Sequence, residues 1–161
     1  MYTVGAPDTD VAAYTRRIED RFEQRFADGI RKYSEQSDVR PCFIFFPMNA
    51  IQFGLSDLLS AYRIQRNLGP DVDFRVWEAD ASLDGVVALL RKIDVAITMR
   101  FHATIFAMSQ DCKVIGIDYR IGKKDKIAGL MEDVGKERYC DRIDLLTGKW
   151  LADRLEELTG S

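Results

Sequence analysis

Residues 93–108 read IDVAITMRFHATIFAM, an apolar run that passes through an arginine and the chain's single histidine into a second apolar run. The first half is rich in β-branched residues, which is typical of a strand buried on both faces. The second half, from Phe101, has the pattern of a compact helix. A strand that ends in Arg100-x-His102 and turns directly into a helix brings cationic side chains to the free N–H groups of the helix N-terminus. Because ligands of open α/β sheets bind beyond the carboxyl ends of the strands, the stretch predicts an anion site.

On both sides of this stretch, helical patterns alternate with short apolar strands. Strands are expected over 41–47, 72–76, 94–99, 114–118 and near 138–140. Helices are expected over 10–34, from a cap at Ser56 to Gly69, from a cap at Ser82, over 101–109, from 126 to Gly135, and from a cap at Thr147. This order predicts βαβ units, and therefore a three-layer α/β/α Rossmann-like domain with a mostly parallel sheet of about five strands. The long first helix should pack on one face of that sheet.

Composition narrows the class of protein. A chain of 161 residues, 47% apolar and 30% charged, fits one globular domain, and its net charge of −3 argues against a nucleic-acid binder. With no signal peptide and no apolar run of membrane-spanning length, we expect a cytoplasmic protein. Cys42, Cys112 and Cys140 match no zinc pattern, so we expect reduced, buried thiols and no metal. Because no G-x-G-x-x-G follows a strand, we expect no nicotinamide or flavin cofactor.

Three spaced segments resemble the polysaccharide pyruvyl transferase family. Residues 94–107 are similar to its signature, a strand that ends in Arg-(Leu/Phe)-His-Ala and continues into an Ile-Phe-Ala helix. Val114–Tyr119 resembles the next family strand, which ends in tyrosine. Lys126–Leu130, followed by Val134-Gly135, resembles the lysine-led helix after it. Together the similarity covers about residues 82–135.

This resemblance implies a fold and an activity. Members have two Rossmann-like domains that face a cleft, similar to the GT-B glycosyltransferases. They transfer the pyruvyl group of phosphoenolpyruvate to a sugar hydroxyl pair of a cell-surface polysaccharide, which yields a ketal and phosphate. The chain, residues 1–161, looks like the C-terminal, phosphoenolpyruvate-binding domain alone, without its first strand. The saccharide acceptor would then bind through a missing N-terminal domain, and the chain alone would be inactive. Phosphoenolpyruvate is the donor substrate, and no cofactor is implied.

Four residues are the candidates for the site. Arg100 and His102 are the expected catalytic residues, and both would also bind substrate. Arg100 offers a planar fork that suits a phosphate or a carboxylate, and His102 is the natural proton carrier. Whether His102 acts as the general acid or as a phosphate ligand stays open. The resemblance adds Lys126 as a further cation, and Tyr119 as a hydrogen-bond donor at a strand end.

Other interpretations remain open. His102 could be a structural histidine, Arg100 could cap a helix or pair with Asp118, and the basic residues at 120–126 could be a solvated face. Asn49 and Gln52, after the first strand, could line the cleft. A second enzyme class is a GT-B glycosyltransferase domain that binds a sugar nucleotide. A third class is a non-catalytic anion-binding α/β module or an oligomerisation domain. The sheet edge left by a missing strand would favour self-association, or cover by the missing domain.

Overall fold

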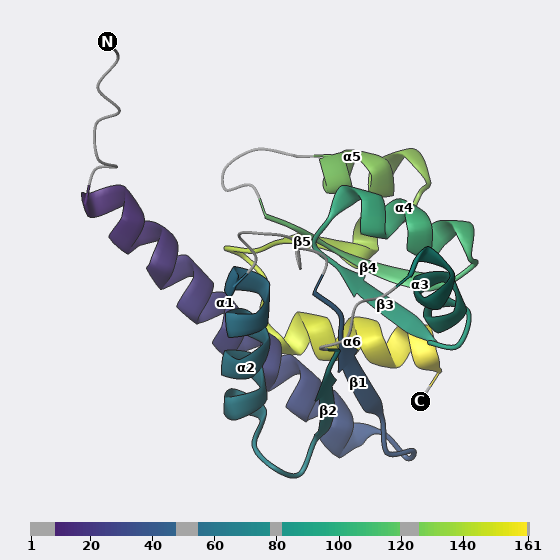
Figure 1. Ribbon diagram of the computed structural model, residues 1–161, viewed down its shortest axis with the longest axis horizontal. Coiled ribbons are helices and arrows are strands. Elements are labelled where there is room, and N and C mark those ends of the chain that lie inside the picture. The colour runs from purple at the N-terminus through teal and green to yellow at the C-terminus, as the bar shows by residue number, and fades with distance from the viewer. Residues whose placement is uncertain (1–8, 48–54, 78–81, 120–125, 161) are drawn as a thin grey trace.

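A computed structural model describes residues 9–47, 55–77, 82–119 and 126–160. Within these residues six α-helices, one short 3-10 helix and five strands follow one another along the chain (Figure 1). In order they are α1 (Thr9–Gln36), β1 (Cys42–Phe45), α2 (Leu55–Leu68), β2 (Asp73–Val76), α3 (Leu83–Leu90), β3 (Val95–Thr98), α4 (Phe101–Ser109), β4 (Lys113–Asp118), α5 (Lys126–Asp133), η1 (Glu137–Tyr139), β5 (Cys140–Arg142) and α6 (Gly148–Thr159). None of the described helices is long and apolar enough to cross a membrane.

The strands are parallel, as predicted, but they form two sheets instead of one. β1 pairs with β2, while β3, β4 and β5 form a separate sheet in that order. The strand at 94–99 is covered on both faces, since Val95 and Ile97 pack on one core and Ala96 on another, but the burial is less complete than predicted. β4 occupies the middle of its sheet and is buried from Val114 to Asp118, whereas β3 is buried only at Ala96 and Thr98. Among the described residues β3 has a strand partner on one side alone, so it lies at the edge of its sheet.

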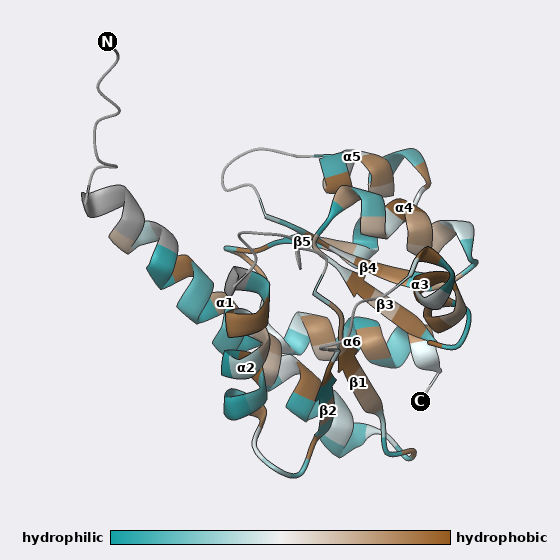
Figure 2. Ribbon diagram, in the orientation of Figure 1, coloured by the Kyte–Doolittle hydropathy of each residue, from teal (hydrophilic) through white to brown (hydrophobic). Residues whose placement is uncertain are grey.

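Helices cover both faces of the three-stranded sheet. On one face Ile115 and Ile117, both fully buried, join a core with residues of α1 and α6. On the other face Val114 and Ala96 pack in a second core with residues of α4 and α5. Figure 1 shows α4 and α5 above this sheet and α6 below it, and Figure 2 shows the apolar strands between them. The larger core also takes in Phe74 of β2, so both sheets share it.

The helices α1 and α6 cross at a point where each helix carries a glycine. A Cβ atom on Gly29 would lie 2.9 Å from the Gly148 carbonyl oxygen, which shows that the two backbones touch. Beyond the crossing, the Tyr33 hydroxyl donates to the Thr159 hydroxyl over 3.1 Å. The predicted helix over 10–34 is confirmed as α1. Its apolar stripe packs against α6 and contributes to the core on one face of the three-stranded sheet.

Several predicted boundaries are confirmed and others are wrong. Ser82 and Thr147 cap α3 and α6 as predicted, since each hydroxyl accepts a backbone N–H over 3.1 Å. Ser56 does not cap α2, because the helix already begins at Leu55. The strand expected near 138–140 begins only at Cys140, where pairing with Gly116 starts. Residues 137–139 instead form a turn that the Tyr139 N–H closes on the Lys136 carbonyl oxygen over 3.0 Å.

The thiols are free but not all buried. Cys112 is buried and Cys140 is half-buried, whereas Cys42 is exposed. The expectation of a buried thiol fails at Cys42 because this residue lies on the outward face of β1, where alternate residues face solvent. The extended start expected for residues 1–7, and the positions of Asn49 and Gln52, lie outside the described residues.

Candidate anion-binding site

A buried pair of threonines holds the turn from β3 into α4. The Thr104 hydroxyl donates to the Arg100 carbonyl oxygen over 2.9 Å, and it therefore accepts from the Thr98 hydroxyl at 2.8 Å. Both threonines are buried, with exposed fractions of 7% for Thr98 and 0% for Thr104. The Thr104 backbone N–H also donates to the same carbonyl oxygen over 2.9 Å. The end of the strand and the first turn of the helix are thus joined around Arg100.

Arg100 is the N-cap residue of α4 and leaves the helix start open. Its backbone is extended (φ −126°, ψ 131°), and its side chain makes no capping hydrogen bond. The N–H groups of the first turn carry the positive end of the helix dipole, and the Arg100 guanidinium adds a cationic group there, with the His102 imidazole in the same turn. Cations are disfavoured at a helix N-terminus unless an anion joins them. The arrangement therefore favours a negatively charged group at this helix start, from the protein or from a ligand.

The Arg100 guanidinium has one anionic partner in the described part of the chain. Its Nη2 lies 3.1 Å from Oδ1 and 3.2 Å from Oδ2 of Asp57, in the first turn of α2. The possible pairing of Arg100 with Asp118 is not what the structure shows. Asp118 is buried at the end of β4, where its carbonyl oxygen accepts the Ile143 N–H over 2.8 Å. Burial of Asp118 beside β5 leaves the exposed guanidinium to the carboxylate of α2.

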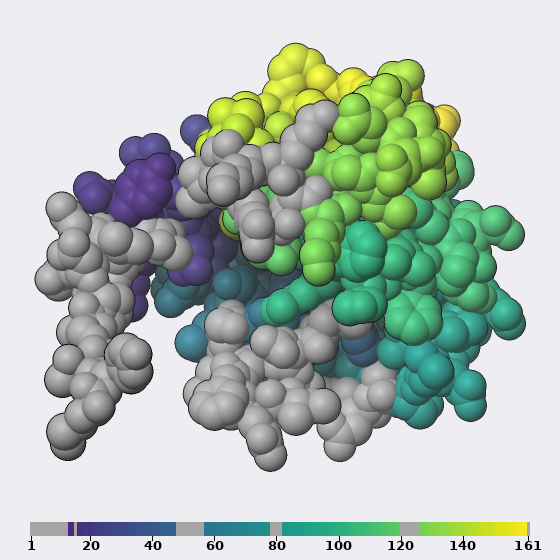
Figure 3. Space-filling view, turned by 90° about the horizontal axis from the view of Figure 1, so that it is seen from above, coloured from purple at the N-terminus to yellow at the C-terminus, as the bar shows by residue number. Residues whose placement is uncertain are grey.

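The side chains of His102 and Lys126 each lie near the ring of Phe101. The His102 ring centroid lies 5.8 Å from that of Phe101, in an edge-on contact. The Lys126 ammonium lies 5.9 Å from the centroid of the same Phe101 ring, within the range of a cation–π contact. Both His102 and Lys126 are exposed. Figure 3 shows α4 and α5, which carry them, as adjoining green surfaces on one face of the molecule.

Tyr119 follows directly on β4, at the same edge of the sheet. Its side chain is 51% exposed, and no hydrogen bond within the described residues joins it to Arg100, His102 or Lys126. His102 and Lys126 thus both lie near the Phe101 ring, and Arg100 lies at the start of the same helix. Tyr119 lies at this edge, and in the described part of the chain no hydrogen bond joins it to the other three.

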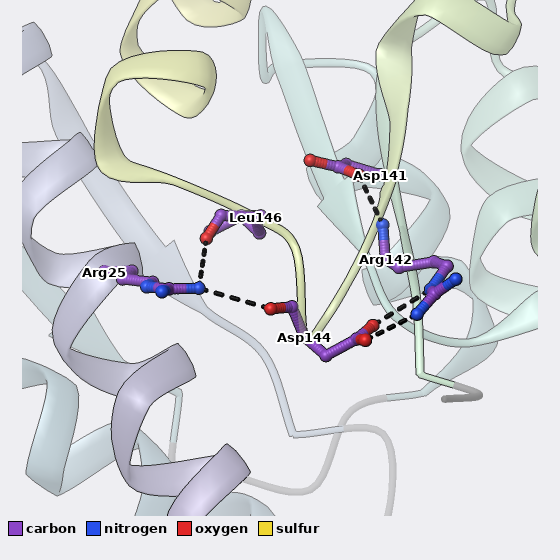
Figure 4. Close-up of polar contacts among 5 residues, drawn as sticks. All are labelled: Arg25, Asp141, Arg142, Asp144 and Leu146. Carbon is purple, nitrogen blue, oxygen red and sulfur yellow. Dashed lines mark hydrogen bonds and ion pairs between the residues drawn. The ribbon is translucent and has the colours of Figure 1, made fainter. Parts of the chain in front are cut away.

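At the carboxyl end of β5, a neighbouring polar cluster is already satisfied (Figure 4). The Arg142 Nε donates to Asp144 Oδ1 over 2.9 Å, and this contact lowers the pKa of Asp144. Burial raises the pKa of Asp141, although its carboxylate accepts the Arg142 N–H over 2.8 Å. Arg25 of α1 donates to the carbonyl oxygens of Asp144 and Leu146, each over 3.2 Å. Because Arg142 is held by Asp144, it is not an open cation comparable to those around the start of α4.

The family comparison covers most of the chain. A family model described as polysaccharide pyruvyl transferase matches residues 5–120. The chain belongs to the polysaccharide pyruvyl transferase family. Membership implies a transferase, and it confirms the resemblance drawn from the 94–107 segment. No curated protein and no solved structure matches the chain.

In this polysaccharide pyruvyl transferase family member, most of the candidate site residues lie within the segment that the family model matches. Asp57, Arg100, His102 and Tyr119 lie inside the matched residues, while Lys126 lies beyond them. Sequence reasoning did not find Asp57, because a pairing across 43 positions leaves no local pattern. The one available signal was its place in the first turn of a helix that follows a strand, at the edge where ligands of such sheets bind.

Proposed function

We propose that this family member binds phosphoenolpyruvate at the carboxyl edge of β3 and supplies its pyruvyl group for transfer to a sugar hydroxyl pair of a cell-surface polysaccharide. The observation that carries the proposal is the open N-terminus of α4, flanked by Arg100 and His102, in a chain of this family. We further propose that the domain is Rossmann-like and forms the donor half of a GT-B-like enzyme. A second domain would hold the saccharide acceptor.

The proposed reaction has defined requirements. One sugar hydroxyl attacks C2 of the donor while the methylene carbon takes up a proton, and the second hydroxyl closes the ketal as the C2–O bond to phosphate breaks. Of the two hydroxyl protons, one balances the new methyl group and the other leaves with phosphate. Arg100 would neutralise the carboxylate or the phosphate, with Lys126 as a further positive charge. His102 would move a proton, either to the methylene carbon or to the departing phosphate.

Calorimetric titration of the chain with phosphoenolpyruvate, and separately with a uridine nucleotide, tests the donor assignment. We expect phosphoenolpyruvate to bind and the nucleotide not to bind, with affinity that falls as salt rises. Arg100→Ala should weaken binding by about 1.5–3 kcal/mol, the range for a hydrogen bond to a charged group. His102→Ala should reduce turnover in the complete enzyme more than it reduces donor binding.

The matched control is Arg91→Ala. Arg91 is an exposed arginine whose Nε donates to Gln110 Oε1 over 2.8 Å, away from the open end of α4. Its replacement should leave the affinity unchanged. Binding of the uridine nucleotide alone would support a sugar-nucleotide domain instead. If neither ligand bound, the proposed donor site would be wrong.

A further inference from the structure

We infer that Asp57 is a positioning residue for Arg100, an inference that rests on the proposed function. The carboxylate contacts the guanidinium through a single nitrogen, with Nη2 at 3.1 Å and 3.2 Å from its two oxygens. Within the described residues, no group accepts a hydrogen bond from Nε or Nη1 of Arg100. The contact therefore anchors one corner of the guanidinium and leaves its other N–H groups available to a ligand.

The two partners differ in how firmly they are held. The Asp57 side chain is 22% exposed, and it belongs to the first turn of a helix whose residues Ala61, Ile64 and Leu68 are buried. The Arg100 side chain is 48% exposed and long, so on its own it would sample many rotamers. The carboxylate is thus the fixed member of the pair. Its effect is to reduce the conformational freedom that Arg100 would otherwise lose when a ligand binds.

The pair also joins two parts of the molecule. Asp57 lies on α2, between β1 and β2, whereas Arg100 caps the helix that follows β3. Of the ion pairs between described side chains, this is the one that connects α2 to α4. The carboxyl edges of the two separate sheets are thereby set relative to each other at the proposed site.

A carboxylate beside a phosphate site also repels the phosphate. The change in affinity on removing Asp57 therefore distinguishes a competing role from a positioning role. If Asp57 mainly competed with the ligand for Arg100, its removal would tighten binding. If it positions Arg100, its removal weakens binding, although the site gains positive charge. The geometry favours positioning, because only Nη2 is occupied.

The experiment is titration with phosphoenolpyruvate of the parent, Asp57→Asn, Arg100→Ala and the double variant, each in the full chain. Asp57→Asn keeps the shape of the side chain and removes its charge. We expect it to weaken binding about three- to tenfold, whereas the double variant should bind as Arg100→Ala does, since Asp57 acts through Arg100. Asp57→Glu should restore part of the affinity. Urea midpoints of each variant report whether the fold is intact.

The control is Asp73→Asn, which breaks a comparable pair with Arg75 (2.9 Å) at the amino end of β2 and should leave binding unchanged. Affinity that is equal or higher in Asp57→Asn, with Arg100→Ala still weakened, would overturn the inference and leave the proposed function intact. Additive losses in the double variant would also overturn it. A parent that does not bind phosphoenolpyruvate, or an Arg100→Ala variant that binds as the parent does, would overturn both.

Discussion

At the scale of single residues, the site depends on how tightly the backbone around Arg100 is held. The Thr98–Thr104 hydroxyl pair is buried, so neither hydroxyl can exchange its partner for water. Burying such a pair is tolerated only because both groups are satisfied. A rigid backbone at Arg100 means that ligand binding needs to order only its side chain, and Asp57 already restrains one end of that side chain.

Cys140 gives a prediction about pH. Burial, together with the nearby carboxylates of Asp118 and Asp141, raises the pKa of this thiol from 9.0 to about 11. In the unfolded chain the thiol returns to its ordinary pKa, so between about pH 9 and 11 the unfolded state loses a proton that the folded state keeps. The free energy of unfolding should therefore fall as pH rises through this window. Below pH 9 the full stability is retained.

Urea unfolding at pH 8.5, 9.5 and 10.5 measures this effect. Cys140→Ala should flatten the decline, because it removes the group that titrates. The comparison uses the slope against pH, since the substitution also removes packing at every pH. An unchanged slope in the variant would show that other groups cause the decline.

The residues of the site differ in how far sequence alone could predict them. Arg100 and His102 could be placed at a strand-to-helix turn because the apolar run, the turn and the helix start are all local patterns. Asp57 could not, since its contact depends on how α2 and α4 pack. His102 and Lys126 were expected in one cluster, but their common contact with Phe101 depends on the packing of α5 on α4.

At the scale of elements, helix bounds and caps could be predicted from local sequence, whereas the pairing of strands could not. Helix α4 begins and ends at the predicted residues, and the hydroxyl caps at Ser82 and Thr147 were visible as Ser or Thr before an apolar period. The separation of the sheet between β1 and β3 was not visible, because each strand segment carries the same apolar signal whether or not its neighbour pairs with it. Strand pairing is decided by tertiary packing.

The crossing of α1 and α6 gives a prediction about stability. Gly29→Ala would bring a Cβ atom to 2.9 Å from both the Gly148 carbonyl oxygen and the Leu151 Cβ, so the helices would have to move apart. We expect a loss of about 1–3 kcal/mol in the free energy of unfolding, the range for overpacking. Denaturant unfolding measures it. The matched control is Gly129→Ala in α5, where nothing lies within 4 Å, and the helix should gain up to about 1 kcal/mol. Equal effects at the two glycines would contradict a close crossing.

At the scale of the whole molecule, the two sheets share one core. Phe74 of β2 belongs to the same buried cluster as Ile117 of β4 and Leu151 of α6. Shared burial couples the unfolding of the parts that contribute to it. Although no strand pairing joins the two sheets in the described residues, we therefore expect them to unfold together.

The chain's two tryptophans can test this coupling. Trp77 follows β2, with its ring 5.9 Å from that of Phe46, and Trp150 packs on the shared core from α6. In Trp150→Phe the remaining fluorescence reports the two-stranded sheet, and in Trp77→Phe it reports α6. In each variant we expect the midpoint of unfolding followed by fluorescence to coincide with the midpoint followed by far-ultraviolet circular dichroism. An earlier fluorescence transition at Trp77 alone would mean that the β1–β2 unit unfolds independently.

The pairing of α1 with α6 also has a consequence for synthesis. The hydrogen bond between Tyr33 and Thr159 joins residues 126 positions apart, and the ribosome adds residues from the N-terminal side. At about 5–20 residues per second, roughly 6–25 s pass between the two. Throughout that interval the apolar stripe of α1 has been translated, and α2 can pack on part of it, but α6 has not yet been completed. That stripe is then the natural target for a chaperone that meets the nascent chain.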